Sequence, residues 1–322
     1  MAISSSNPAS VSETRVTTSS RRHALALAIG AGSLLRGLLS AAETATPLRF
    51  AISEAMVGDV NLNDARAAMQ IWVKRMAQEL DIAIDPKLFS TTQEIVDRVR
   101  KGQLDAVALH IIEHRQIASL LDSSQVVTSA GADGLNQYLI LVKQNSGIRQ
   151  LGDLKGRRLC VLKNSRMCVA PAWLFTILED GHYGSAEQFF ATVVTKAKFS
   201  RVVLPVFFGQ ADACLTSKLG FDTMCELNPQ VARDLKVLVS SPSMVVSFYM
   251  FRKSYQNMNR EKLIKALSSM RASPAGGQLA TLFQFDALLV RDASCLTGPL
   301  SVLDAADRAH ARQAQRGAKD KA

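Results

Sequence analysis

The sequence contains one five-residue pattern twice, about one domain length apart. Residues 102–106 read Gly-Gln-Leu-Asp-Ala, and residues 209–213 read Gly-Gln-Ala-Asp-Ala. In both places a helix-forming segment precedes the glycine, and an apolar run follows the aspartate. Glycine suits the left-handed position after the last turn of a helix, and a short apolar run is typical of a buried strand. The pattern therefore predicts the same helix-to-strand unit in each of two α/β lobes.

Apolar spacing supports a strand and helix alternation on both sides of residue 135. A period of two or a short apolar run predicts strands at 48–52, 82–84, 104–109, 126–130, 138–142, 158–162, 192–195, 235–239 and 245–251. A period near 3.6 predicts helices at 64–80, 91–101, 171–180, 200–209, 259–271 and 274–283. Thr91 and Glu94 form a capping box at the start of the second helix. We therefore expect two lobes, each with a mostly parallel sheet flanked by helices, joined by two hinge strands.

These segments divide the chain into four parts. We expect an export signal over residues 1–42, a first lobe from 47–130 plus 245–300, a second lobe from 135–240, and a basic tail over 304–322, read as a solvated helix or a loose end. A chain of 322 residues with 48% hydrophobic residues can fill one large core or two smaller ones.

The first 42 residues resemble a twin-arginine export signal. Arg21 and Arg22 precede an apolar stretch that reaches Leu35, and residues 40–42 supply small side chains for a signal peptidase. An ordinary secretory signal is the alternative. No lipobox cysteine follows the apolar stretch, so we expect a free periplasmic protein with a cleavable signal rather than a lipoprotein.

Composition argues against two other classes. The net charge is +10, but the excess of basic residues lies mainly in the first 42 residues and in the tail, and aromatic residues are only 6%. A nucleic-acid surface needs a basic stripe with stacking aromatics, so we expect no nucleic-acid partner. We also expect the protein to be a monomer.

The five cysteines match neither a disulfide framework nor a metal knuckle. They are interpreted as buried small residues, with Cys160–Cys168 or Cys214–Cys225 pairing left open.

Three motifs together resemble the phosphate/phosphonate-type substrate-binding proteins of ABC transporters. They are the doubled Gly-x-x-Asp-Ala unit, the Asp-Leu-Lys-Gly turn at 153–156 and the strand that begins at Tyr138. The resemblance spans residues 47–290 and implies a type II periplasmic-binding fold, in which two lobes close on a ligand about a hinge. At the ligand loops the chain departs from the family. Residues 164–168 replace a Ser-Thr-Ser-type anion cradle, and residues 199–201 stand where a histidine is common.

Ligands of open α/β lobes bind beyond the carboxyl ends of the strands, where helix amides favour negative charge. This rule and the resemblance select the candidate ligand contacts Glu54, Met56, His110, Tyr138, Asn164, Ser165, Arg166, Ser200 and Arg201. Hydroxyls at Ser165 and Ser200 can donate to an anion, although helix capping explains them equally well. Arg166 and Arg201 can clamp an oxyanion, although each also fits a solvated surface charge. Glu54 instead favours an amine or a cation.

Residues 110–114 compete with this interpretation, because they match the His-x-x-Glu-His pattern of zinc peptidases. That chemistry needs His110 and His114 on one face of a continuous helix, with Glu113 beside the metal-bound water. His110 directly follows the strand 104–109, so we expect it in a loop before the helix. We therefore expect no metal, no cofactor and no catalytic residue, and a zinc hydrolase is the least favoured alternative.

The sequence thus predicts a periplasmic protein, not an enzyme. We expect it to capture a small anionic ligand, phosphonate-like or phosphate-like, between its lobes and to deliver it to an ABC permease. The alternative is a binding module of the same fold that serves a membrane sensor, either a sensor kinase or a chemoreceptor.

Overall fold

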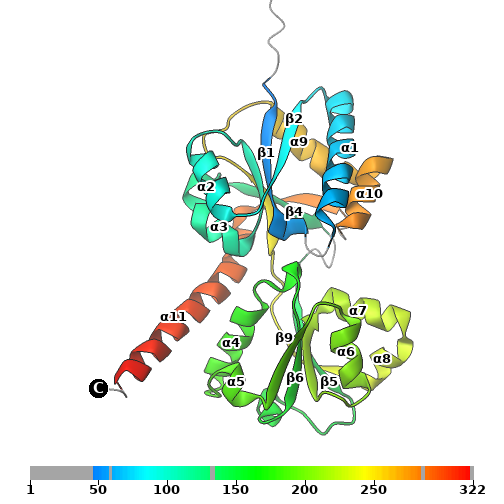
Figure 1. Cartoon of the computed structure of the whole chain (residues 1–322), viewed down its shortest axis with the longest axis vertical. Coiled ribbons are helices and arrows are strands. Elements are labelled where there is room, and N and C mark those ends of the chain that lie inside the picture. Colours follow the sequence, from blue (N-terminus) through cyan, green and yellow to red (C-terminus); the bar gives the residue numbers. More distant parts are fainter. Residues whose placement is uncertain (1–45, 58–59, 131–134, 284–286, 320–322) are drawn as a thin grey trace, which may run out of the picture. The chain divides into compact units, whose positions relative to one another are not determined.

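Two separate β-sheets organise the chain (Figure 1). The computed structural model describes residues 46–57, 60–130, 135–283 and 287–319, which belong to one compact unit, Ala45–Ala322. The export signal predicted at residues 1–42 lies outside the described residues. Among the helices that are described, none is long and apolar enough to cross a membrane.

The first sheet has the strand order β11-β4-β10-β3-β1-β2. Its strands are β1 (Leu48–Ser53), β2 (Ile84–Phe89), β3 (Ala106–His110), β4 (Gln125–Ala130), β10 (Ser247–Phe251) and β11 (Ala287–Asp292). The helices that accompany these strands in the chain are α1 (Leu62–Leu80), α2 (Thr92–Arg100), α3 (Ile111–Ile117), α9 (Asn259–Ser268) and α10 (Pro274–Leu282).

The second sheet has the order β7-β6-β8-β5-β9. Its strands are β5 (Tyr138–Lys143), β6 (Arg158–Leu162), β7 (Thr192–Lys196), β8 (Ala213–Ser217) and β9 (Leu235–Ser240). The helices in this part of the chain are α4 (Ala170–Asp180), α5 (Ala186–Phe189), α6 (Ser200–Phe207), α7 (Lys218–Leu227) and α8 (Pro229–Asp234).

Both sheets are mixed, where the sequence predicted mostly parallel ones. Strand β1 pairs in parallel with β2 and β3, and β6 pairs in parallel with β7 and β8. Every other pairing, which involves β4, β5, β9, β10 or β11, is antiparallel. The two segments that connect the sheets also pair, because Asn136 N donates to Met244 O at 2.7 Å and Met244 N donates to Asn136 O at 2.9 Å. Parallel neighbours need a long crossover connection, usually a helix, whereas antiparallel neighbours do not. Strands that enter a sheet directly from the other sheet can therefore pair antiparallel, and each sheet contains both directions.

The doubled Gly-Gln-x-Asp-Ala unit makes the same ion pair in each sheet. Asp105, just before β3, accepts from Arg49 N at 3.0 Å and Arg49 Nε at 2.9 Å. Asp212, just before β8, accepts from Arg158 N at 2.8 Å and Arg158 Nε at 3.0 Å. The glycines that precede them have φ of 67° and 75°, which a residue without a Cβ adopts at little cost. The unit therefore fixes the start of one parallel strand against its neighbour, at the sheet edge opposite to the carboxyl ends.

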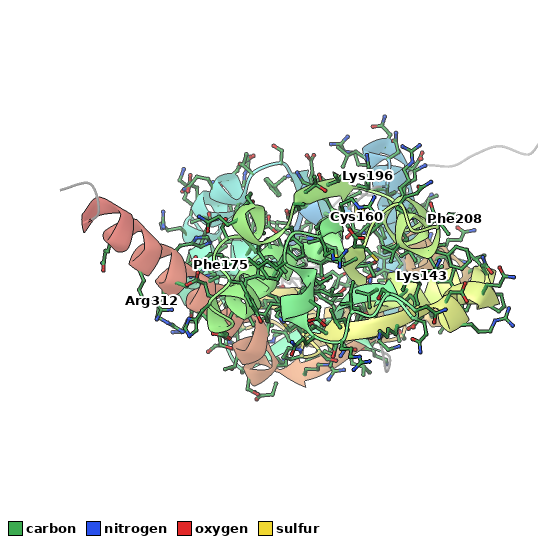
Figure 2. The ribbon with its side chains drawn as sticks, turned by 90° about the horizontal axis from the view of Figure 1, so that it is seen from below. Lys143, Cys160, Phe175, Lys196, Phe208 and Arg312 are labelled. Carbon is green, nitrogen blue, oxygen red and sulfur yellow. The ribbon has the colours of Figure 1, made fainter. Side chains whose placement is uncertain are left out.

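The predicted basic tail belongs to a long helix, α11 (Thr297–Lys319), which is anchored as far as His310 rather than loose. Phe175 of α4, labelled in Figure 2, stacks on His310 with ring centroids 3.8 Å apart. Arg115 pairs with Asp304 at 2.9 Å and with Asp307 at 2.6 Å. Ala306 and Ala309 are buried in this helix, and alanines give only a weak apolar signal in a sequence.

All five cysteines are free in the structure, so neither of the two pairings left open by the sequence is formed. Burial raises the pKa of the Cys168 thiol to about 12. Burial also raises the pKa of Cys214, whose neighbour across the parallel β6–β8 pairing is Cys160. These thiols therefore stay protonated near neutral pH, as buried small residues do.

Candidate functional site

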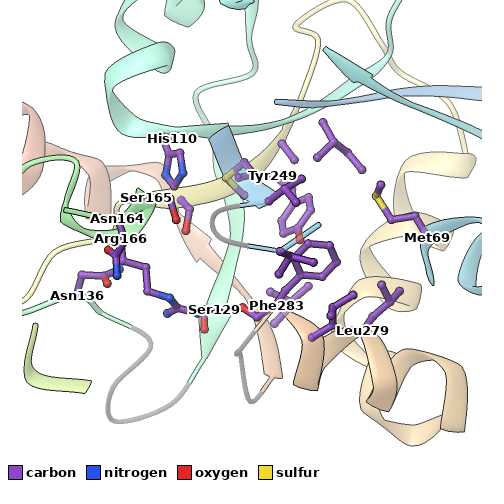
Figure 3. Close-up of a pocket in the computed structure, with 18 of the residues that line it drawn as sticks. Met69, His110, Ser129, Asn136, Asn164, Ser165, Arg166, Tyr249, Leu279 and Phe283 are labelled. Atoms are coloured by element: carbon purple, nitrogen blue, oxygen red, sulfur yellow. Dashed lines mark hydrogen bonds between the residues drawn. The ribbon is translucent and has the colours of Figure 1, made fainter. Parts of the chain in front are cut away.

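A cavity with a volume of about 560 Å³ is lined by residues of both sheets and their helices. Polar side chains gather on one side of it, and apolar side chains lie on the other (Figure 3). The polar lining consists of His110, Ser129, Asn136, Asn164, Ser165, Arg166, Lys198, Ser200, Thr223 and Ser247. Most of these residues follow or end a strand, as ligand contacts in α/β lobes do.

The cavity is lined by six of the nine residues that the sequence selected, namely Met56, His110, Asn164, Ser165, Arg166 and Ser200. Glu54, Tyr138 and Arg201 do not line it. Glu54 instead pairs with Arg66 at 3.4 Å, and Arg201 is exposed. The expectation that Glu54 would place a carboxylate beside the ligand is therefore not met by the geometry.

Ser165 and Ser200 are the first residues of their helical turns, but neither hydroxyl caps a helix. The N-cap positions belong to Asn164 and Phe199, and neither of these side chains makes a capping hydrogen bond. The capping interpretation of the two serines is therefore wrong, and both residues line the cavity.

His110 ends β3 and lies in the wall of the cavity between two backbone carbonyls. Its Nε2 lies 3.0 Å from Ala55 O, and its Nδ1 lies 3.2 Å from Val246 O. Both ring nitrogens face carbonyl oxygens, and the tautomer decides which of them donates. The ring thus connects the short helix Glu54–Val57 with the segment that precedes β10.

Glu113 acts as a structural acceptor rather than as a base beside a metal. Its Oε1 accepts from Ser53 Oγ at 2.5 Å and Thr92 Oγ1 at 3.1 Å, and its Oε2 accepts from His110 N at 2.9 Å. His110 has extended backbone before α3, and burial lowers the pKa of His114, which packs edge-on against Phe248. Within the described ranges, no group of three His, Cys, Asp or Glu side chains is placed to hold a metal ion. The helical geometry required for zinc hydrolysis is not formed by this motif.

Tyr138 positions the loop that carries Asn164, Ser165 and Arg166. Its hydroxyl donates to Arg166 O at 3.1 Å and accepts from Val169 N at 3.3 Å. The side chain is fully buried, and this burial raises the pKa of Tyr138 well above its ordinary value, so the phenol remains a donor. Tyr138, selected from the sequence as a ligand contact, therefore holds the backbone of the loop that carries three other candidate contacts.

We expect Tyr138→Phe to lower the free energy of unfolding by about 1–3 kcal/mol, because a part-buried carbonyl and a buried amide both lose their partner. Urea denaturation followed by circular dichroism measures this change. Tyr183→Phe is the matched control, since its hydroxyl makes no hydrogen bond to the described part of the chain. Equal losses in the two variants would contradict the positioning role.

The polar side of the cavity is electropositive. Arg166 Nη2 donates to Phe283 O at 2.9 Å; burial lowers the pKa of Arg166, yet a guanidinium stays protonated in proteins. Lys198 and Ser200 lie at the amino end of α6, where helix amides carry partial positive charge. No aspartate or glutamate occurs among the described residues that line the cavity. This arrangement can hold an oxyanion by charge and by hydroxyl donors.

Sequence reasoning missed five polar lining residues and, apart from Met56, the apolar lining. The polar residues are Ser129, Asn136, Lys198, Thr223 and Ser247. Lys198 had one available signal, since it lies two residues before the predicted helix start at residue 200. The apolar lining had none, because residues such as Met69 and Leu279 have the spacing of ordinary core positions.

Two mixed α/β sheets, paired connecting segments and a cavity lined from both sheets define a substrate-binding protein of the type II periplasmic-binding fold. The model of the family described as "ABC transporter, phosphonate, periplasmic substrate-binding protein" matches residues 56–294, well over half of the chain. The chain belongs to this family, whose members are substrate-binding components of transporters.

Solved structures share the fold at low sequence identity. A Xanthomonas citri protein with bound ATP has a TM-score of 0.56 and 14% identity, covering 82% of this chain and 98% of that one. PhnD1 from Prochlorococcus marinus, in complex with methylphosphonate, has a TM-score of 0.53 and 14% identity, with the same 82% and 98% coverage. No curated protein matches the sequence.

Proposed function

We propose that this protein captures a small oxyanion of the phosphonate or phosphate class and delivers it to an ABC permease. The observation that carries the proposal is the charge of the cavity: Arg166, Lys198 and the amino end of α6 line it, with no acidic side chain among its described lining. In this proposal Asn164, Ser165 and Ser200 donate to the anion. Met56 and His110 shape the wall, whereas Glu54, Tyr138 and Arg201 are not direct contacts.

The two sheets form the cores of two lobes in this proposal, made of residues 47–130 plus 245–300 and of residues 135–240. The lobes close on the anion about the paired segments at Asn136 and Met244, as hinged binding proteins do. The signal at 1–42 exports the chain to the periplasm, where it acts as a monomer. It performs no chemistry on its ligand.

A thermal-shift screen tests the anion class. Phosphate, phosphite, methylphosphonate and methanesulfonate are compared with putrescine and other small amines. A ligand present at about 100 times its Kd stabilises the folded protein by about 2.7 kcal/mol, which corresponds to a rise of roughly 5 °C in Tm. We expect this rise with at least one oxyanion and with no amine. A rise with amines alone would overturn the proposal.

A further inference from the structure

The cavity extends well beyond its electropositive side. Its opposite wall is made by Met69, Trp72, Tyr249, Met270, Leu279 and Leu288. All except Tyr249 belong to the buried core of the first sheet, and Tyr249 packs against that core. Figure 3 shows Met69, Tyr249 and Leu279 on the side away from Asn164 and Arg166.

The apolar side carries no charge among the described residues. Its one titratable side chain is Tyr249, and burial raises the pKa of this phenol to about 12, so it is neutral at physiological pH. The Nε1 of Trp72 is a buried donor without a partner in the described ranges, and with the Tyr249 hydroxyl it offers a polar contact there but no charge. A second charged group on a ligand would therefore lose its water without gaining a counter-charge. The ligand therefore bears its charge at one end.

The cavity is also larger than a one-carbon phosphonate requires. About 560 Å³ lies within the range of roughly 300–1,000 Å³ that is typical of sites for drug-sized molecules. Methylphosphonate has five non-hydrogen atoms and would occupy only the polar side. We call the space beside Met69, Trp72 and Leu279 the apolar chamber. Apolar cavities are poorly hydrated, so an apolar group that enters this chamber replaces little ordered water and gains contact with its walls.

We propose that the ligand is amphiphilic, with one phosphonate-type or phosphate-type head group and an uncharged hydrocarbon or aryl group of several carbons. The head group binds beside Arg166, Lys198 and Ser200, and the hydrocarbon fills the space between Met69, Trp72 and Leu279. This inference rests on the proposed function, because it assigns the substrate class of the same site.

Titration calorimetry with methyl-, butyl-, hexyl-, octyl- and phenylphosphonate tests the inference below their micellar concentrations. Each methylene that enters the chamber is expected to lower Kd about fourfold, until the chamber is full and Kd becomes constant. Matched n-alkanols and n-alkylamines test the head group, and we expect both to bind at least 100-fold more weakly than the phosphonates.

The outcomes separate this inference from the proposed function. If methylphosphonate binds as tightly as the longer compounds, or more tightly, the amphiphilic class is wrong and the oxyanion function stands. If alkanols or alkylamines bind as tightly as phosphonates of equal length, the oxyanion function is wrong, whereas the assignment of the apolar chamber to a hydrocarbon group is kept. If no compound binds, both are overturned.

A filled chamber provides a second test. Leu282 ends α10 in the cavity lining and is only half-buried, so Leu282→Trp adds bulk there with little strain on the core. We expect hexylphosphonate to bind at least 20-fold more weakly to this variant, with Kd for methylphosphonate changed by less than threefold. Ile71→Trp is the control, because Ile71 is 57% exposed on α1 and does not line the cavity. Unchanged hexylphosphonate binding in Leu282→Trp would overturn the assignment of the chamber.

Discussion

Asp105→Asn is expected to lower the free energy of unfolding by about 2–4 kcal/mol, whereas Asp212→Asn should lower it by less than about 1 kcal/mol. The two residues occupy the same position in the doubled unit, and each accepts from the backbone and the guanidinium of one arginine. They differ in burial, since 4% of the Asp105 side chain and 23% of the Asp212 side chain is exposed. Asp105 also accepts from Arg252 Nη2 at 3.3 Å.

The difference arises because a buried arginine that loses its carboxylate keeps an uncompensated charge, while an exposed arginine regains water. Arg252, at 19% exposure, has little access to water, whereas Arg158 is 48% exposed. Urea denaturation of the two variants and the wild type at pH 7 measures both changes. Equal losses would show that burial does not decide the strength of the pair.

The same comparison has a pH dependence of known sign. Burial raises the pKa of Asp105, but the hydrogen bonds and charge of Arg49, together with Arg252, lower this pKa by more, so it falls below its ordinary value. A carboxyl with a lowered folded-state pKa stabilises the protein above its unfolded-state pKa of about 3.9 and loses this effect as pH falls through the folded-state value. The stability gap between wild type and Asp105→Asn should therefore shrink below about pH 4. A gap of constant size from pH 7 to pH 3 would contradict the ion-pair account.

The helix-to-strand structure of the doubled unit could be predicted from the sequence, because it depends on residues that are close together in the chain. Gly102 and Gly209 end helices, and the apolar runs that follow Asp105 and Asp212 form strands whatever the rest of the chain does. What the aspartates bind was not readable, since Arg49 and Arg158 are more than fifty positions away from them. One of the two hydrogen bonds of the predicted capping box is formed, since Thr91 Oγ1 accepts from Glu94 N at 3.4 Å. The Glu94 carboxylate instead accepts from Arg98.

Strand direction was the part of the fold that the sequence did not determine. Strand β5 is a continuous apolar run, as expected of a parallel strand, yet it lies between two antiparallel partners. Burial on both faces produces such a run in either case, so direction depends on how the chain crosses between sheets. Helices α5, α7 and α8 and strand β11 were not predicted.

The sequence predicted the residues of the candidate site that follow the ends of strands. It did not predict those whose place depends on the packing of the chain. Asn164, Ser165, Arg166 and Ser200 follow β6 and β7, and the rule for open α/β lobes places such residues at a ligand site. Whether the hydroxyl of Tyr138 reaches the cavity or the backbone of the next loop depends on the position of Val169 in space. For the same reason, the apolar side of the cavity could not be distinguished from core.

Arg166→Gln is expected to weaken the binding of methylphosphonate, or of the oxyanion that binds most tightly, by about 30- to 1,000-fold. The substitution removes a partly buried guanidinium, and truncating one partner of a buried charge pair costs about 2–4 kcal/mol. Titration calorimetry measures the change in Kd, and circular dichroism verifies the fold of the variant. Arg201→Gln is the control, because it removes the same charge from an exposed position outside the cavity lining.

Arg166 has a second interaction that this experiment must separate from its charge. Its Nη2 donates to Phe283 O, which connects the loop after β6 with the end of α10. Arg166→Lys keeps the charge but loses the planar fork that binds an oxyanion with two parallel bonds. If charge dominates, Arg166→Lys should recover at least tenfold of the affinity lost in Arg166→Gln, and Arg201→Gln should change Kd by less than threefold. If Arg166→Lys and Arg166→Gln are equally weak, bidentate geometry or the bond to Phe283 is the main contribution; an equal loss in Arg201→Gln would exclude a specific role for Arg166.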